Sequence, residues 1–136
     1  MKNIILIACL LSLPAFATKA ELPKPATKAN VTYQTDIKPI LDASCIKCHT
    51  ANDKPKARLG LDSLSAIQRG SKGGPVILAG NSAKSKLVLT VAHVGDPDSF
   101  MPRGKDAKAL TADQIGLIRA WIDQGGHWQL GKPRIV

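Results

Sequence analysis

A short cysteine motif constrains this chain more than any other feature of its sequence. Residues 45–49 read Cys-Ile-Lys-Cys-His, and they hold both of the cysteines that follow Cys9. Two thiols separated by two residues and followed at once by a histidine are typical of three sites: a covalent haem attachment site, half of a zinc site, or a redox dithiol. Because each site needs different surroundings, the rest of the sequence has to decide among them.

The zinc and dithiol interpretations find little support elsewhere in the chain. A structural zinc ion needs four ligands, and Cys45 and Cys48 supply two. His49, His93 and His127 would have to complete the set, because no second cysteine pair is present. A thioredoxin-type dithiol expects a strand, a turn and a helix around its cysteines, and no such pattern surrounds the motif. Both interpretations stay open as minor alternatives.

The haem interpretation accounts for more of the sequence. Cys45 and Cys48 can each add to one vinyl group of a porphyrin, and His49 then binds the iron as its proximal ligand. For the opposite face we expect Met101, the single methionine after Met1. It lies in a loop rich in Pro, Gly and Asp, where a methionine has no helical core face to fill. A His/Met pair raises the reduction potential, because a thioether favours ferrous iron. We expect His93 to be a hydrogen-bonded structural histidine rather than a rival ligand.

The start of the chain indicates export. Lys2 precedes an apolar run of 13 residues, and Ala15-Phe16-Ala17 places small residues at the −3 and −1 positions of a cleavage site. This is the pattern of a secretory signal peptide, and the run is too short to span a bilayer. We predict a signal peptide over residues 1–17, a periplasmic or otherwise exported product, and no stable membrane insertion after cleavage. An uncleaved anchor and lipidation at Cys9 are the alternatives.

The remaining chain divides into a leader, one domain and a tail. Residues 18–31 are rich in Pro, Lys, Ala and Thr, which predicts a flexible leader that tethers or spaces the domain. Residues 32–130 form the predicted domain, and residues 131–136 form a C-terminal tail. A chain of 136 residues has no room for a second core of useful size.

Apolar periodicity within the domain predicts helices and no strand of useful length. The predicted helices cover about residues 33–44, 63–68, 81–94 and 111–124. The last is the clearest, because Thr111 and Gln114 form a capping box and Gly125-Gly126 ends it. In the third, Asn81 or Ser82 would be the cap. We therefore predict a small all-α domain.

The charge of the chain points to protein partners. Removal of residues 1–17 takes away one of the 19 basic residues and none of the 10 acidic ones, so the charge of +9 falls to +8. Export argues against nucleic acid as a partner, and no nucleic-acid-binding motif is present. A basic exported domain is expected to dock on redox partner proteins that carry an acidic surface.

The order of these motifs resembles class I c-type cytochromes, and most closely the planctomycete-type cytochrome c domain. The similarity rests on DIKPILDASCIKCH, ARLGLDS, GGPVILAGNSAKSKLV, a Met-Pro loop and ALTADQIGLIRAWIDQGG, and it covers residues 33–128. It implies a cytochrome c-like helical domain around one covalent haem c, with Cys45 and Cys48 carrying the haem and with His49 and Met101 on its iron. The family often has a second proline after Met-Pro, where this chain has Arg103.

Three further residues are weaker candidates for contacts with the haem. Arg58 and Arg103 could pair with a haem propionate, because a guanidinium group matches a carboxylate. Trp121 could pack on the macrocycle edge or belong to a helix–helix core. The expected function is single-electron transfer by a monohaem cytochrome that is not an enzyme. A haem-bearing sensor or a subunit of a larger redox complex is the main alternative, and a small haem peroxidase is a weaker one.

Overall fold

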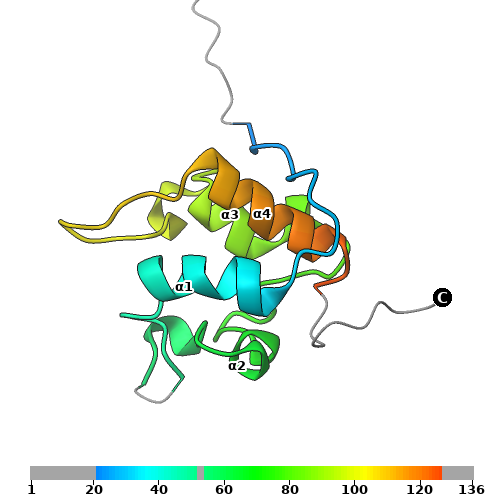
Figure 1. Cartoon of the computed structure of the whole chain (residues 1–136). Helices are drawn as coiled ribbons and strands as arrows, with labels where there is room; N and C mark the ends of the chain where they lie inside the picture. Colours follow the sequence, from blue (N-terminus) through cyan, green and yellow to red (C-terminus); the bar gives the residue numbers. More distant parts are fainter. Residues whose placement is uncertain (1–20, 52–53, 127–136) are drawn as a thin grey trace, which may run out of the picture.

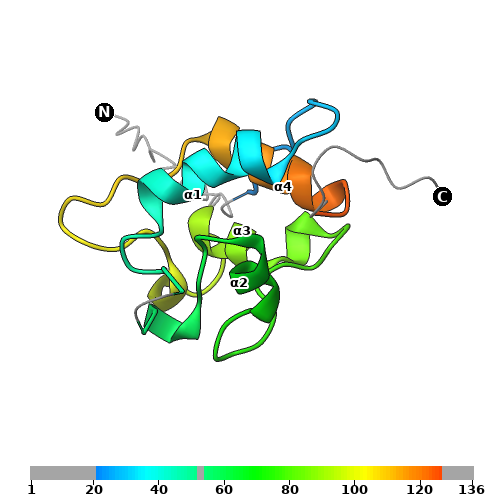
Figure 2. The ribbon, with the colours of Figure 1, turned by 60° about the horizontal axis from the view of Figure 1, so that its bottom comes forward.

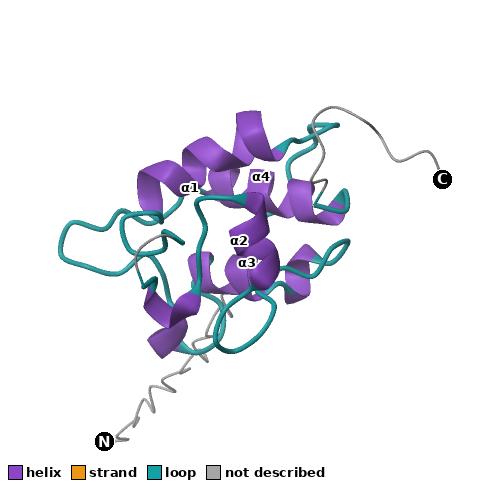
Figure 3. Ribbon diagram, turned by 90° about the horizontal axis from the view of Figure 1, so that it is seen from below, coloured by secondary structure: helices purple, strands orange, loops and turns teal. Residues whose placement is uncertain are grey.

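The computed structural model describes residues 21–51 and 54–126, which fold into a helical domain with no strand among them (Figures 1 and 3). The predicted signal peptide, residues 18–20 and the C-terminal tail lie outside the described residues, as do residues 127–130. The prediction of an all-α domain is confirmed. No helix in the described part of the chain is long and apolar enough to cross a membrane.

Eight helical segments follow one another along the described residues. They are η1 (Tyr33–Ile37), α1 (Lys38–Ser44), η2 (Lys56–Arg58), α2 (Leu64–Arg69), η3 (Ser82–Lys84), α3 (Lys86–Val91), η4 (Pro97–Ser99) and α4 (Ala112–Asp123). η1 is a π-helical turn that continues directly into α1, so together they match the predicted helix over 33–44. Ser63 caps α2, and Thr111 and Gln114 form the predicted capping box of α4.

The core lies where α4 packs against η1, η3 and α3, with α1 continuing from η1 (Figures 1 and 2). Trp121 and Ile118 of α4 are fully buried, as are Ile37 and Leu41 on the first helical segment. The rings of Tyr33 and Trp121 lie with their centroids 6.0 Å apart and tilted by 40°. This interface holds the largest buried side chains, so it carries the greatest share of the hydrophobic stabilisation.

One predicted helix is interrupted. We expected Asn81 or Ser82 to cap a continuous helix through Val94, but η3 ends at Lys84 and Ser85 is extended (φ −72°, ψ 121°). Ser85 is fully buried, and its hydroxyl accepts the Leu78 N–H at 2.9 Å while donating to the Asn81 carbonyl at 2.9 Å. These local bonds compete with the helix and break it at Ser85.

The N-terminal strap, residues 21–31, packs on the domain, whereas the sequence predicted a flexible leader there. Ala26 N–H donates to the Gly116 carbonyl at 2.9 Å, and Arg119 donates to the Pro23 carbonyl. Gly116 permits this approach, because a Cβ built on it would lie 2.8 Å from the Lys24 carbonyl oxygen. α4 therefore holds the strap through the main chain at Pro23 and Ala26, and packed structure begins before residue 32.

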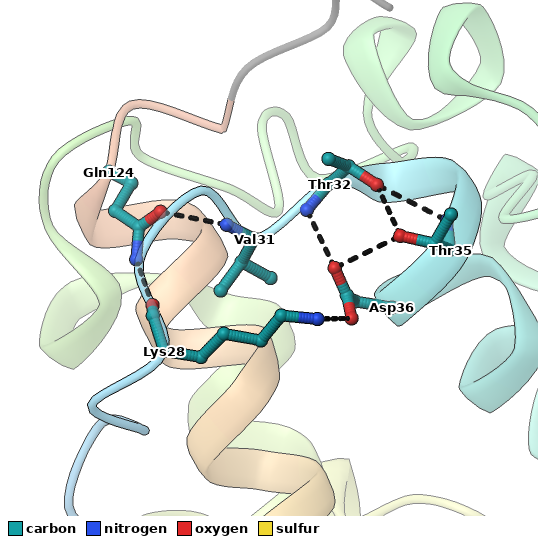
Figure 4. A network of polar contacts seen from close by, with 6 residues as sticks. All are labelled: Lys28, Val31, Thr32, Thr35, Asp36 and Gln124. Carbon is teal, nitrogen blue, oxygen red and sulfur yellow. Dashed lines mark hydrogen bonds and ion pairs between the residues drawn. The ribbon is translucent and has the colours of Figure 1, made fainter. Parts of the chain in front are cut away.

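The end of the strap is joined to both ends of the helical core (Figure 4). Gln124, just after α4, accepts the Val31 N–H at 3.0 Å and donates to the Lys28 carbonyl at 2.8 Å. Lys28 also pairs with Asp36 on η1, whose carboxylate accepts the Thr32 N–H. The pKa of Asp36 lies below its ordinary value, chiefly because its carboxylate accepts a hydrogen bond from the Lys28 side chain.

Candidate haem-binding site

The Cys-x-x-Cys-His motif forms the turn that follows α1. Cys45 is the C-cap of α1, with its N–H donating to the Leu41 carbonyl at 2.8 Å, and His49 N–H donates to the Cys45 carbonyl at 3.0 Å. Leu61 N–H then donates to the His49 carbonyl at 2.7 Å. The turn is thus held to α1 on one side and to the following loop on the other, which places both cysteines and the histidine on one short, fixed segment.

The His49 ring is held in the tautomer that an iron ligand requires. Its Nδ1 lies 3.2 Å from the Leu59 carbonyl oxygen. A carbonyl oxygen can only accept, so Nδ1 carries the proton and donates it. The neutral ring therefore keeps its lone pair on Nε2, where a metal can bind. A second partner that orients a ligating histidine in this way is the usual arrangement at metal sites.

The burial of Cys45 argues against a redox dithiol. Both are free thiols; Cys45 is half-buried against the core and Cys48 is exposed. Burial raises the pKa of Cys45 to about 11. A reactive dithiol needs a lowered pKa, because the thiolate is the nucleophile. In the described part of the chain no three His, Cys, Asp or Glu side chains group to hold a metal ion, so a four-ligand zinc site finds no support; His127 lies outside that part.

Met101 lies half-buried at the start of the loop that protrudes between η4 and α4 (Figures 1 and 2). Its backbone N–H donates to the Thr90 carbonyl at 3.2 Å. The Nε2 atom of His93 lies 3.0 Å from the Met101 carbonyl oxygen, so Nε2 carries a proton and donates it. His93 is hydrogen-bonded, as expected, and its structural role remains a prediction. Residues 103–109, further along this loop, are exposed.

The three weaker candidates for contacts with the haem differ in their exposure and in the groups that they contact. Arg103 is exposed and its Nε donates to the Phe100 carbonyl at 3.0 Å, so its guanidinium group contacts its own loop. Arg58 is exposed in η2 with φ +55°. Trp121 is buried in the helical core beside Tyr33. For Trp121, the helix–helix interpretation is the one these contacts favour.

Two further contributors were not among the sequence candidates. The Leu59 carbonyl orients His49, and the Thr90 carbonyl holds Met101. Every residue has a main-chain carbonyl, so the residue types at positions 59 and 90 give no sequence signal for either contact. The first is supplied by the segment ARLGLDS, where Ala57 and Arg58 take left-handed backbone conformations.

Comparisons with known proteins bear on this region. Residues 45–104 match the family model described as Planctomycete cytochrome C. The chain is 30% identical over 125 residues to hydrazine synthase subunit alpha of Kuenenia stuttgartiensis, in a match that covers 72% of this chain. That match covers 15% of the relative, so the chain spans a small part of the relative's length. No solved structure matches the chain with significance.

Proposed function

Because residues 45–104 are a planctomycete-type cytochrome c domain, we propose that this protein transfers single electrons between redox partners outside the cytoplasm. A cytochrome c domain implies covalently bound haem c, whose iron supplies the ferric–ferrous couple. Cytochrome c domains are typically exported. A periplasmic location, reached through the predicted signal peptide, completes the proposal.

Four residues are proposed to hold the haem. Cys45 and Cys48 would carry the two thioether bonds, His49 would bind the iron through Nε2, and Met101 would bind it through its sulfur. The observation that carries the role of His49 is its Nδ1–H donating to the Leu59 carbonyl, since this leaves Nε2 with a lone pair. Neither ligand has to be exchanged when the protein gains or loses an electron, so the structural rearrangement accompanying each transfer is small.

Docking is proposed to depend on basic residues near the motif and the Met101 loop. In residues 54–58 and 103–108 the exposed charged side chains are Lys54, Lys56, Arg58, Arg103, Lys105, Asp106 and Lys108. One of these seven is acidic, so the local field is positive. A partner with an acidic face would associate faster at low salt, because long-range attraction is screened within about 8 to 10 Å at physiological ionic strength.

An absorption spectrum of Met101→Ala tests the ligand assignment. The ferric protein should show the weak far-red band that marks a methionine sulfur on iron, and Met101→Ala should lose it while its ferrous form gains carbon monoxide binding. Lys105→Ala, an exposed change in the same loop, is the matched control and should keep the band. Rapid carbon monoxide binding by the unaltered protein would contradict the assignment and favour a catalyst or sensor.

Export and docking need separate measurements. The protein recovered from the periplasm should begin at Thr18, and its electron transfer to an acidic redox partner should slow as salt rises. A mature protein that retains residues 1–17 would contradict export through a cleaved signal. A rate indifferent to ionic strength would contradict electrostatic docking.

A second candidate is a haem-bearing subunit of a larger redox complex. The observation that favours it is the 30% identity to a stretch that is 15% of a hydrazine synthase subunit, since a similar domain there lies within a longer chain. Size-exclusion chromatography of the protein from its native source separates the candidates, because a carrier elutes at the mass of the single chain and a subunit elutes with its complex.

A further inference from the structure

The C-cap of α3, Ala92, is followed by His93, a residue with a left-handed backbone conformation. Val94 N–H donates to the Leu89 carbonyl at 2.9 Å, and His93 N–H lies 3.4 Å from the Thr90 carbonyl. These bonds form a Schellman motif, in which the left-handed residue after the C-cap is usually glycine. His93 occupies that position with φ +55°. A histidine there carries backbone strain that glycine would not, so the helix stop alone does not explain the residue.

The His93 side chain makes two contacts with the Met101 loop. Its Nε2–H donates to the Met101 carbonyl at 3.0 Å, and its ring stacks on Phe100 with centroids 4.8 Å apart and planes 8° apart. The Met101 N–H is taken by the Thr90 carbonyl, one turn earlier in the chain than His93. Both main-chain polar groups of Met101 are therefore held by the end of α3.

We propose that His93 is a positioning residue that fixes Met101 in the conformation from which its sulfur binds iron. This inference rests on the proposed function, in which Met101 is the distal ligand. The loop beyond Met101 is exposed and offers little burial to hold the residue in place. A ligand that occupies its binding conformation for a larger fraction of the time binds correspondingly more strongly. His93 is itself exposed, so water competes for the bond and its effect is a few-fold one.

Three substitutions of His93 separate the hydrogen bond from the ring and the backbone. His93→Gly suits the left-handed conformation and removes both contacts. His93→Phe keeps a stacked ring and removes the donor. His93→Gln keeps an N–H donor at a similar reach and removes the ring. Thermal unfolding of each haem-loaded variant checks the fold, and His93→Gly should unfold close to the temperature of the unaltered protein, because relief of the left-handed strain offsets the two lost contacts.

Competition with imidazole measures the strength of the Met101 bond. Imidazole displaces a methionine from ferric iron, so its apparent affinity rises when that bond weakens. We expect His93→Gly and His93→Phe to raise the apparent imidazole affinity about five-fold, which is the ratio that one lost hydrogen bond gives. Both variants should also show a weaker far-red ferric band. His93→Gln should remain within about two-fold of the unaltered protein, since it restores the donor.

The alternatives give different results. Equal imidazole affinity in all four proteins would overturn the inference and leave the proposed function standing. A His93→Gln affinity as high as that of His93→Gly would also overturn it, because the donor would then have no effect. An unaltered protein that lacks the far-red band and binds imidazole as Met101→Ala does would overturn the distal ligand itself, and with it this inference.

Discussion

The helical scaffold and the ligand loops of this molecule are specified in different ways. The helical scaffold, made of the strap, η1, α1 and α4, is held by fully buried apolar side chains such as Trp121 and by polar bonds between distant segments. The ligand loops, the described parts of residues 45–61 and 93–102, are held by hydrogen bonds to main-chain carbonyls such as those of Leu59, Thr90 and Met101. In the described residues five non-glycine residues have left-handed φ values, and all but Asn30 lie in the ligand loops.

This difference separates stability from ligand chemistry. Buried area in the scaffold supplies most of the free energy of folding, while strained loop conformations are retained where the function needs them. Changes in the scaffold should therefore lower the free energy of unfolding and leave the iron ligands unchanged. Changes in the ligand loops should alter the binding of the iron and leave the free energy of unfolding nearly unchanged.

Trp121→Ala should have the largest effect on stability. The side chain is fully buried against Tyr33, so its loss leaves a large cavity between α4 and the first helical segment. We expect the free energy of unfolding, measured by urea denaturation of the haem-loaded protein, to fall by about 3 to 5 kcal/mol. The far-red ferric band should persist in the folded fraction. A loss of the band with little loss of stability would break the comparison.

Asp123→Ala should cost less, because it removes polar contacts alone. The Asp123 carboxylate accepts the Ser82 N–H at 2.7 Å and the Ser82 hydroxyl at 2.8 Å, and Ser82 is buried. Leaving those donors without a partner should lower the free energy of unfolding by about 1 to 3 kcal/mol in the same assay. Asp106→Ala, which removes an exposed loop carboxylate, is the control and should change it by about 0.5 kcal/mol or less.

Tyr33→Phe should reveal a pH dependence within the scaffold. Among the described residues the buried hydroxyl has no hydrogen-bond partner, and its pKa is raised above 10.0 by burial first and then by Asp42 and Asp62. A raised pKa in the folded state means that the neutral hydroxyl is favoured, so stability is complete below pH 10 and is lost as pH rises through the folded pKa.

The variant should therefore be equal in stability or up to about 1 kcal/mol more stable at pH 7, and its advantage should grow above pH 10. Tyr33 is the single tyrosine of the chain, so its ionisation can be followed directly by ultraviolet absorption. An ionisation at the pH of free tyrosine, with parallel stability curves for the two proteins, would refute this account.

Gly116→Ala should have the smallest net effect on global stability. The added Cβ would meet the Lys24 carbonyl at 2.8 Å and displace the strap, while alanine improves the helix propensity of α4 by up to about 1 kcal/mol. Release of the strap should make the bond after Lys28 accessible to trypsin. Gly73→Ala is the control, since its nearest neighbour is the flexible end of Lys86 at 3.6 Å. Equal cleavage of both variants would argue against strap release.

Local signals in the sequence were sufficient for most of the helices. The capping box at Thr111 and Gln114 lies within one turn of the helix it begins, so the sequence alone predicts it. The break at Ser85 depends on a buried hydroxyl that contacts Leu78, and the docked strap depends on Arg119 and Gly116, more than 80 residues away. Such contacts arise only after the chain has folded.

The same limit applies to the site. The cysteines and His49 are contiguous, and their spacing is the signal, so the motif could be read directly from the sequence. The acceptor for His49 is a main-chain carbonyl, which any residue at position 59 supplies. The contact of His93 with Met101 joins a helix end to a loop; the sequence predicted a hydrogen bond for His93 but did not identify its partner.

The docked strap also sets how far the domain can move from whatever precedes it in the chain. Eleven residues in an extended conformation would span roughly 36 to 40 Å and would let a tethered domain search a wide volume. Residues 21–31 instead lie bound along α4 and the end of η1, so that length is not available as a leash. The strap therefore adds no free length between the domain and an attachment upstream of residue 21.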